Sequence, residues 1–300
     1  GFHGCSVAAT VMSNDDSTRR RRFLQVAGSA GLAAVAGCSS IGGSGDQPTD
    51  EPTPDDEMTD EPTPTDDGMM EEVTLTLRVE NVAPTDFYGS DTATGGQIWI
   101  TPGAYAVHTG DNPIFTAGEP ASVGLEAVAE AGPPTGFPDQ PGLVDELPEV
   151  DRVSSVGAFT PSDTVEDPND PMGAVPGAPP IAPGGAFEVG VEAEPGDRLS
   201  FATMYVPSND VFFSPTSAIP FYEDGEPVQG DVTDAVGLFD AGTELNGQPG
   251  VDTTGAPAQG GNGGPTIGAT EGVVHPADMV NDAYRYADPS EVIRVTVSPQ

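Results

Sequence analysis

Leu199-Ser-Phe-Ala-Thr-Met-Tyr-Val-Pro-Ser-Asn-Asp-Val-Phe-Phe213 is the stretch from which the fold of this chain can be worked out. From Leu199 to Tyr205, large apolar side chains alternate with smaller or polar ones, which is the two-residue period of a β-strand. Its aromatic residues also suit the pleated surface of a buried strand. Pro207 has no amide donor, and the Ser-Asn-Asp that follows is typical of a turn. The strand is therefore expected to end here and to place Asp210 in a loop.

A second segment, Val236-Gly-Leu-Phe-Asp-Ala-Gly-Thr-Glu244, repeats this arrangement further along the chain. Its apolar residues predict a strand over residues 236–239, and the turn after it opens with Asp240 and closes with Glu244. Two strand ends that each deliver carboxylates to a loop are suited to a hard cation, which takes several oxygen ligands in irregular geometry. The alternative is that Asp210 and Asp240 are ordinary turn aspartates that cap their own loops.

The remaining pattern predicts an all-β domain over residues 73–300. Alternation predicts further strands over residues 73–80 and 187–194, and residues 292–297 are expected to form the last strand. Residues 97–101 carry the only tryptophan, Trp99. Apolar residues at helical spacing predict one short helix over residues 121–130. Residues 133–184 are rich in Pro, Gly and Asp and are expected to form long ordered loops, and residues 247–270 form a Gly-rich loop. Short strands separated by turns indicate an antiparallel β-sandwich.

The two acidic turns also resemble a known family. Pro-Ser-Asn-Asp210 after an apolar strand, followed by Leu-Phe-Asp240-Ala-Gly-Thr-Glu244, is similar to the spondin N-terminal domain family, whose animal members are secreted matrix and adhesion proteins. Shorter matches occur at residues 124–132, 181–184 and 293–297, so that the resemblance covers residues 73–298. Val211 stands where the family would have a tryptophan.

The resemblance implies a C2-like sandwich with a divalent cation, Ca²⁺, where two loops meet at one pole. Asp210 and Asp240 would be direct ligands and Glu244 a third, with backbone carbonyls of residues 206–208 completing the shell. It also implies a binding or adhesion module rather than an enzyme, with an extracellular protein or polysaccharide as its partner.

The charge of the chain excludes several classes of partner. Its 9 basic residues, all arginine, face 48 acidic residues, which gives a formal net charge of −39. Such a surface repels nucleic acids and anionic lipid headgroups. Acidic surfaces without lysine resemble those of extreme halophiles, where salt screens the self-repulsion, so that a salt-loving archaeon is the expected source.

Residues 1–38 have the features of an export signal. Arg20 and Arg21, inside a run of four arginines, resemble a twin-arginine motif, and the apolar run 23–37 is too short to span a bilayer. The run ends in Val-Ala-Gly-Cys38, which resembles a lipoprotein cleavage site with lipid on the cysteine sulfur. We therefore expect a protein anchored by lipid on the outer face of the cell membrane. Translation could start at Gly1 or Met12, and processing before Cys38 leaves no second cysteine for a disulfide.

Residues 39–72 predict a disordered tether between this anchor and the domain. Thr-Asp-Glu-Pro-Thr-Pro occurs at residues 49–54 and again at 59–64, without apolar periodicity. Proline and self-repelling charge keep such a segment extended. Its threonines are candidate positions for O-linked sugar.

Catalytic motifs are weak in the sequence. After Cys38 the chain has two histidines, His108 and His275, too few for a typical tetrahedral zinc site, and it has no Gly-x-Ser-x-Gly elbow. The glycine run 260–264 lacks the Lys-Ser/Thr of a phosphate-binding loop. The alternative to a binding module is a secreted glycoside-cleaving enzyme that uses paired carboxylates. A convergent pocket holding an acid of raised pKa would favour the enzyme.

Overall fold

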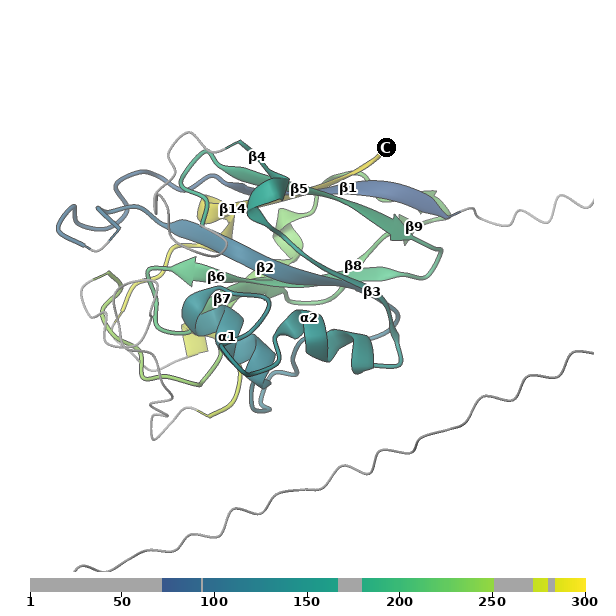
Figure 1. Cartoon of the computed structure of the whole chain (residues 1–300). Helices are drawn as coiled ribbons and strands as arrows, with labels where there is room; N and C mark the ends of the chain where they lie inside the picture. Colours follow the sequence, from purple (N-terminus) through teal and green to yellow (C-terminus); the bar gives the residue numbers. More distant parts are fainter. Residues whose placement is uncertain (1–71, 93, 167–179, 251–271, 280–283) are drawn as a thin grey trace, which may run out of the picture. The chain divides into compact units, whose positions relative to one another are not determined.

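The computed structural model describes residues 72–92, 94–166, 180–250, 272–279 and 284–300, and the fold below refers to these residues (Figure 1). The chain divides into two units, residues 1–64 and 65–300, and every described residue belongs to the second. The predicted export signal with Arg20, Arg21 and Cys38, and the predicted tether up to residue 71, lie outside the described residues.

The regular structure of the second unit is mostly antiparallel strands, as the sequence predicts. The strands are β1 (Val73–Asn81), β2 (Trp99–His108), β3 (Val153–Ala158), β4 (Thr164–Glu166), β5 (Ala186–Ala193), β6 (Arg198–Val206), β7 (Val211–Pro215), β8 (Ile219–Pro220), β9 (Tyr222–Glu223), β10 (Glu226–Pro227), β11 (Gly230–Asp231), β12 (Val236–Asp240), β13 (His275–Pro276) and β14 (Ile293–Pro299). The helices are α1 (Val123–Ala131), α2 (Leu143–Glu146) and α3 (Pro289–Val292), with 3₁₀ turns at Leu147–Glu149, Pro161–Asp163, Thr233–Ala235 and Ala277–Met279.

The strands form two main sheets that lie one above the other (Figure 1). The five-stranded sheet has the order β11-β14-β1-β5-β4, and the second sheet has the order β13-β12-β7-β6-β2-β3, with β8 beside β6. A register shift between β2 and β6 occurs at Gly103, where a Cβ atom would lie 2.0 Å from the carbonyl oxygen of Ala202. Only glycine fits at this bulge.

The main core lies between the two sheets. It joins Leu75 and Leu77 of β1 with Phe187 of β5, and with Phe201 and Phe213 of the second sheet, and all five side chains are fully buried. This packing accounts for the alternation in β1, whose inner residues are apolar and whose outer residues are polar.

A second apolar layer covers the opposite face of the β6 sheet. Leu125 and Val128 of α1 and Leu143 of α2 pack there against Ala202 of β6 and Phe212 of β7. Figure 1 shows α1 and α2 lying along this face of the second sheet. Because both faces of the sheet are covered, residues 199–206 of β6 are all buried, including those with small or polar side chains.

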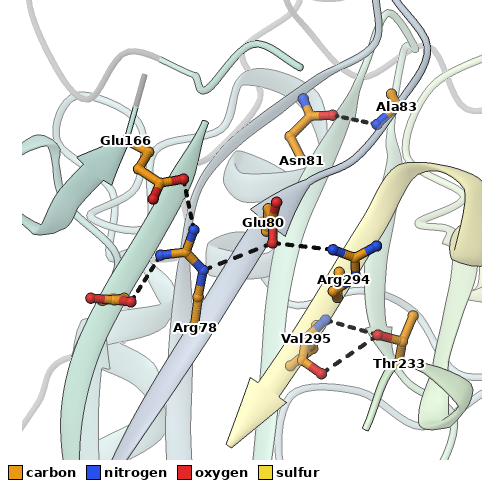
Figure 2. A network of polar contacts seen from close by, with 9 residues as sticks. Arg78, Glu80, Asn81, Ala83, Glu166, Thr233, Arg294 and Val295 are labelled. Carbon is orange, nitrogen blue, oxygen red and sulfur yellow. Dashed lines mark hydrogen bonds and ion pairs between the residues drawn. The ribbon is translucent and has the colours of Figure 1, made fainter. Parts of the chain in front are cut away.

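The outer face of the five-stranded sheet carries most of the paired arginines. Arg78 on β1 lies 2.8 Å from Glu188 and 2.8 Å from Glu166, and Glu80 lies within 4 Å of both Arg78 and Arg294 (Figure 2). These ion pairs connect neighbouring strands β4, β5, β1 and β14.

The prediction of long loops over residues 133–184 is wrong in its described part. Helix α2 and strands β3 and β4 occupy segments of it, and α2 and α3 add to the single helix that the sequence predicts. None of the helices within the described ranges is long and apolar enough to serve as a membrane span.

Candidate functional site

The two predicted acidic turns meet at one end of the second sheet. Strand β6 ends at Val206 and β7 begins at Val211, while β12 pairs antiparallel with β7 so that Asp240 lies opposite Val211. The carbonyl oxygen of Asp210 accepts a hydrogen bond from the amide of Ala241 at 3.0 Å, which extends this pairing by one residue. Asp210 and Asp240 therefore lie on adjacent, hydrogen-bonded segments of the second sheet, and both side chains are fully buried.

Asp210 holds the loop that follows β12. Its Oδ2 atom accepts hydrogen bonds from the backbone amides of Thr243 at 2.8 Å and Glu244 at 3.0 Å, and from the Thr243 hydroxyl at 3.2 Å. In the same way Asn209 Oδ1 accepts from the amide of Gly247 at 3.0 Å. The β6–β7 turn thus fixes the conformation of residues 243–247.

Asp240 organises its own turn. Its Oδ1 atom accepts from the amide of Gly242 at 2.8 Å, which is the geometry of an Asx turn. Gly242 has a φ of +68°, and a Cβ there would lie 2.4 Å from the Val273 carbonyl oxygen, so that glycine is required. The Oδ2 atom of Asp240 accepts from Asn246 Nδ2 at 2.5 Å, and Asn246 Oδ1 accepts from the Tyr286 hydroxyl at 3.1 Å.

Glu244 and Glu130 supply two more buried carboxylates. Glu244 is 2% exposed and Glu130, in the last turn of α1, is 0% exposed. Glu244 Oε2 and both carboxylate oxygens of Glu130 are buried without a hydrogen-bond partner among the described residues. Burying an ionised carboxylate without a partner is costly, so these oxygens call for a proton or a cation.

Burial and like charge shift the titration of this pair. Burial raises the pKa of Glu130 to about 7, and the nearby Glu244 carboxylate adds to the shift. The pKa of Glu244 is also raised, mainly by burial and further by the charge of Glu126. The site therefore contains two acids, Glu130 and Glu244, whose pKa values are both raised.

Packing of α1 brings Glu130 to the site. Ser122 caps the helix by accepting from the amide of Leu125 at 3.2 Å, and the buried Leu125 and Val128 pack against the β6 sheet. Sequence reasoning missed Glu130 because it lies about 140° around the helix from Leu125, off the apolar stripe that predicts α1.

The described side chains do not form a ready-made metal site. Within the described part of the chain, no group of three or more His, Cys, Asp or Glu side chains is placed to hold a metal ion. Asp210 and Asp240, predicted as direct ligands, accept hydrogen bonds from the loop in the manner of the turn-capping alternative. Their role as ligands stays a prediction. The unpartnered oxygens of Glu130 and Glu244 do fit a cation, with carbonyl and water oxygens completing its shell.

No family model matches the sequence, and no characterised protein matches it significantly.

Proposed function

We propose that this protein is a surface-anchored extracellular binding or adhesion module of the spondin type, with a calcium ion at the pole where Glu130 and Glu244 meet. Support for the fold-level part of this proposal comes from the antiparallel sandwich and from the meeting of the two acidic turns. The export signal and Cys38 supply the proposed twin-arginine route and lipid anchor.

One observation carries the calcium part. Glu130 and Glu244 are both buried and close enough for their charges to interact, and three of their four carboxylate oxygens have no hydrogen-bond partner among the described residues. A divalent cation between them would replace repulsion with attraction and would supply ligand contacts to those oxygens. In this proposal Asp210 and Asp240 shape the loop that presents Glu244.

Thermal melts in calcium and in magnesium, at matched ionic strength, test the proposal. We expect calcium to stabilise the wild type by RT ln(1 + [Ca]/Kd), about 2.7 kcal/mol at a hundredfold excess over Kd. Glu244→Gln should abolish this increment, whereas Asp240→Asn should reduce it by loosening the loop. Glu149→Gln, at an exposed position, is the matched control for the loss of one negative charge.

The same measurement has an outcome that contradicts the proposal. Equal thermal shifts in wild type, Glu244→Gln and Glu149→Gln would mean that calcium acts as a diffuse counterion on an acidic surface. Glu130 and Glu244 would then share a proton rather than a metal.

The enzyme alternative has less support. Glu130 has the raised pKa expected of a general acid, but a glycosidase must bring its substrate to both carboxylates. Both are almost fully buried, and neither lines any of the hollows described for this fold. We therefore favour binding over catalysis.

A further inference from the structure

Arg285 differs from the other arginines in the described residues. Arg78 and Arg294 form ion pairs, and the guanidinium groups of Arg152 and Arg198 donate to backbone carbonyls. The guanidinium of Arg285 forms no hydrogen bond or ion pair with a described residue, and its Cζ lies 4.6 Å from the centre of the Phe87 ring. In a chain with 48 acidic residues, an arginine whose guanidinium contacts neither a carboxylate nor a carbonyl oxygen of a described residue is unexpected.

The backbone around Arg285 is held in place by tyrosines. The Tyr88 hydroxyl donates to the Arg285 carbonyl oxygen at 2.9 Å and lies 2.7 Å from the Tyr205 hydroxyl. Tyr205 in turn accepts from the amide of Ala287 at 3.3 Å. The rings of Phe87 and Tyr88 meet edge to face at 4.9 Å. The cation is therefore presented from a fixed backbone beside a fixed aromatic pair, which lowers the entropy lost on binding.

A hollow of about 550 Å³ opens beside this arginine. Its lining consists of Phe87, Tyr88, Gly89, Gln248, Pro249, Tyr284 and Arg285. None of these described lining residues is acidic. The described lining offers a ligand aromatic rings, one guanidinium group and one side-chain amide.

An adjoining hollow of about 930 Å³ shares Tyr284 and Arg285 with the first. It is also lined by Tyr286, Asp278 and Asp288, whose carboxylates can accept hydrogen bonds from hydroxyl groups. Tyr284, at the boundary between the hollows, is 37% exposed. Two adjoining hollows fit successive units of one chain better than a single small molecule.

We propose that the surface formed by Phe87, Tyr88, Tyr284 and Arg285 binds a polysaccharide that contains uronic acid. The sugar carboxylate pairs with the guanidinium fork of Arg285, and the C–H face of the ring packs on the aromatic side chains. Hydroxyl groups of the next sugar face Asp278 and Asp288. This inference rests on the proposed binding function and names the class of its ligand.

Calorimetric titration of the full chain with trigalacturonate in molar sodium chloride tests the proposal. The methyl ester of the same trisaccharide, which lacks the carboxylates, and triglutamate, which lacks the sugar, are the matched ligands. We expect the ester and the peptide to bind at least about 10-fold more weakly than the uronate, because each offers only half of the recognised chemistry.

Substitutions at Arg285 and Tyr284 test whether trigalacturonate binds at the proposed surface. Arg285→Gln should weaken trigalacturonate at least about 10-fold, and Arg285→Lys should not restore it, because lysine lacks the bidentate fork. Arg294→Gln makes the same change of charge on β14 and should leave affinity within about twofold. Tyr284→Ala should weaken the uronate and the ester alike.

Three results would overturn the inference: no binding of trigalacturonate, equal binding of the ester or the peptide, or unchanged affinity in Arg285→Gln. A calcium titration of the same samples separates the two proposals. Calcium stabilisation without uronate binding would reject the ligand while leaving the proposed calcium site intact.

Discussion

Glu130→Gln is the substitution that probes the buried carboxylates most directly. The amide keeps the shape of the side chain in the last turn of α1 but cannot ionise. Burial raises the pKa of Glu130 from its ordinary value of 4.5 to about 7, so the folded protein binds more protons than the unfolded chain between these values. The stability linked to Glu130 is therefore present below about pH 4.5 and is lost as the pH rises through 7.

The size of this loss follows from the pKa values. A rise from 4.5 to about 7 corresponds to about 3 kcal/mol of folding free energy at alkaline pH. Without calcium, Glu130→Gln should therefore be more stable than wild type by up to about 3 kcal/mol at pH 8.5 and nearly equal to it at pH 4.5. For a domain of this size the difference in melting temperature is roughly 6–12 °C.

Thermal melts of wild type, Glu130→Gln and Glu149→Gln from pH 4.5 to 8.5, in molar potassium chloride with a chelator, measure the effect. The control corrects for the removal of one surface charge. A gap between wild type and Glu130→Gln that does not change with pH would refute the reasoning, because it would show that Glu130 titrates alike in both states. Saturating calcium should close the gap at pH 8.5 by stabilising only the wild type.

Three further predictions concern the surface, the anchor and the core. The melting temperature should rise steeply from 0.1 to 2 M potassium chloride as screening increases, and a flat profile would exclude charge repulsion as the dominant surface effect. Cys38→Ser should move the protein from the detergent phase to the aqueous phase in a phase separation, and unchanged partitioning would reject the lipid anchor. Asn81→Ala should destabilise the domain by about 2–4 kcal/mol in denaturant melts. Buried Asn81 donates to the carbonyls of Ile98 and Ile181 and accepts from the Ala83 amide (Figure 2). Exposed Thr74→Ala is the control, and an equal loss there would contradict the prediction.

The two-residue period is clearest in the predicted strands that have one covered face. In β1 and β14, buried and exposed residues alternate, so the two-residue period is visible without knowledge of the partner strands. The sequence could not reveal β7 in this way. Phe212 packs against the helical layer and Phe213 against the core between the sheets, so both are buried and the period disappears.

Strand β3 escaped prediction for the opposite reason. It lies at the edge of its sheet, pairs with β2 only, and has no fully buried residue, so that its sequence shows little contrast between its faces. Helix α2 is only four residues long, which is too short for a helical period.

At the site, the proximity of Asp210 and Asp240 was predictable and Glu130 was not. Asp210 lies in the turn after β6 and Asp240 is the last residue of β12, and the loops at one end of an antiparallel sandwich converge. Their hydrogen bonds to the loop depend on local backbone geometry that no residue pattern specifies. Glu130 reaches the site through the packing of α1, a contact between distant parts of the chain.

The pairing of β1 with β14 has a consequence for the order of events during synthesis. Residues 75–81, near the start of the folded unit, form their ladder with residues 293–299. The five-stranded sheet therefore lacks the partner of its central strand until residue 299 has left the ribosome. Closure of a loop of this length is slow, and until then the unpaired edge of β1 is open to other strands. Folding of this domain is therefore completed only after β14 has been translated.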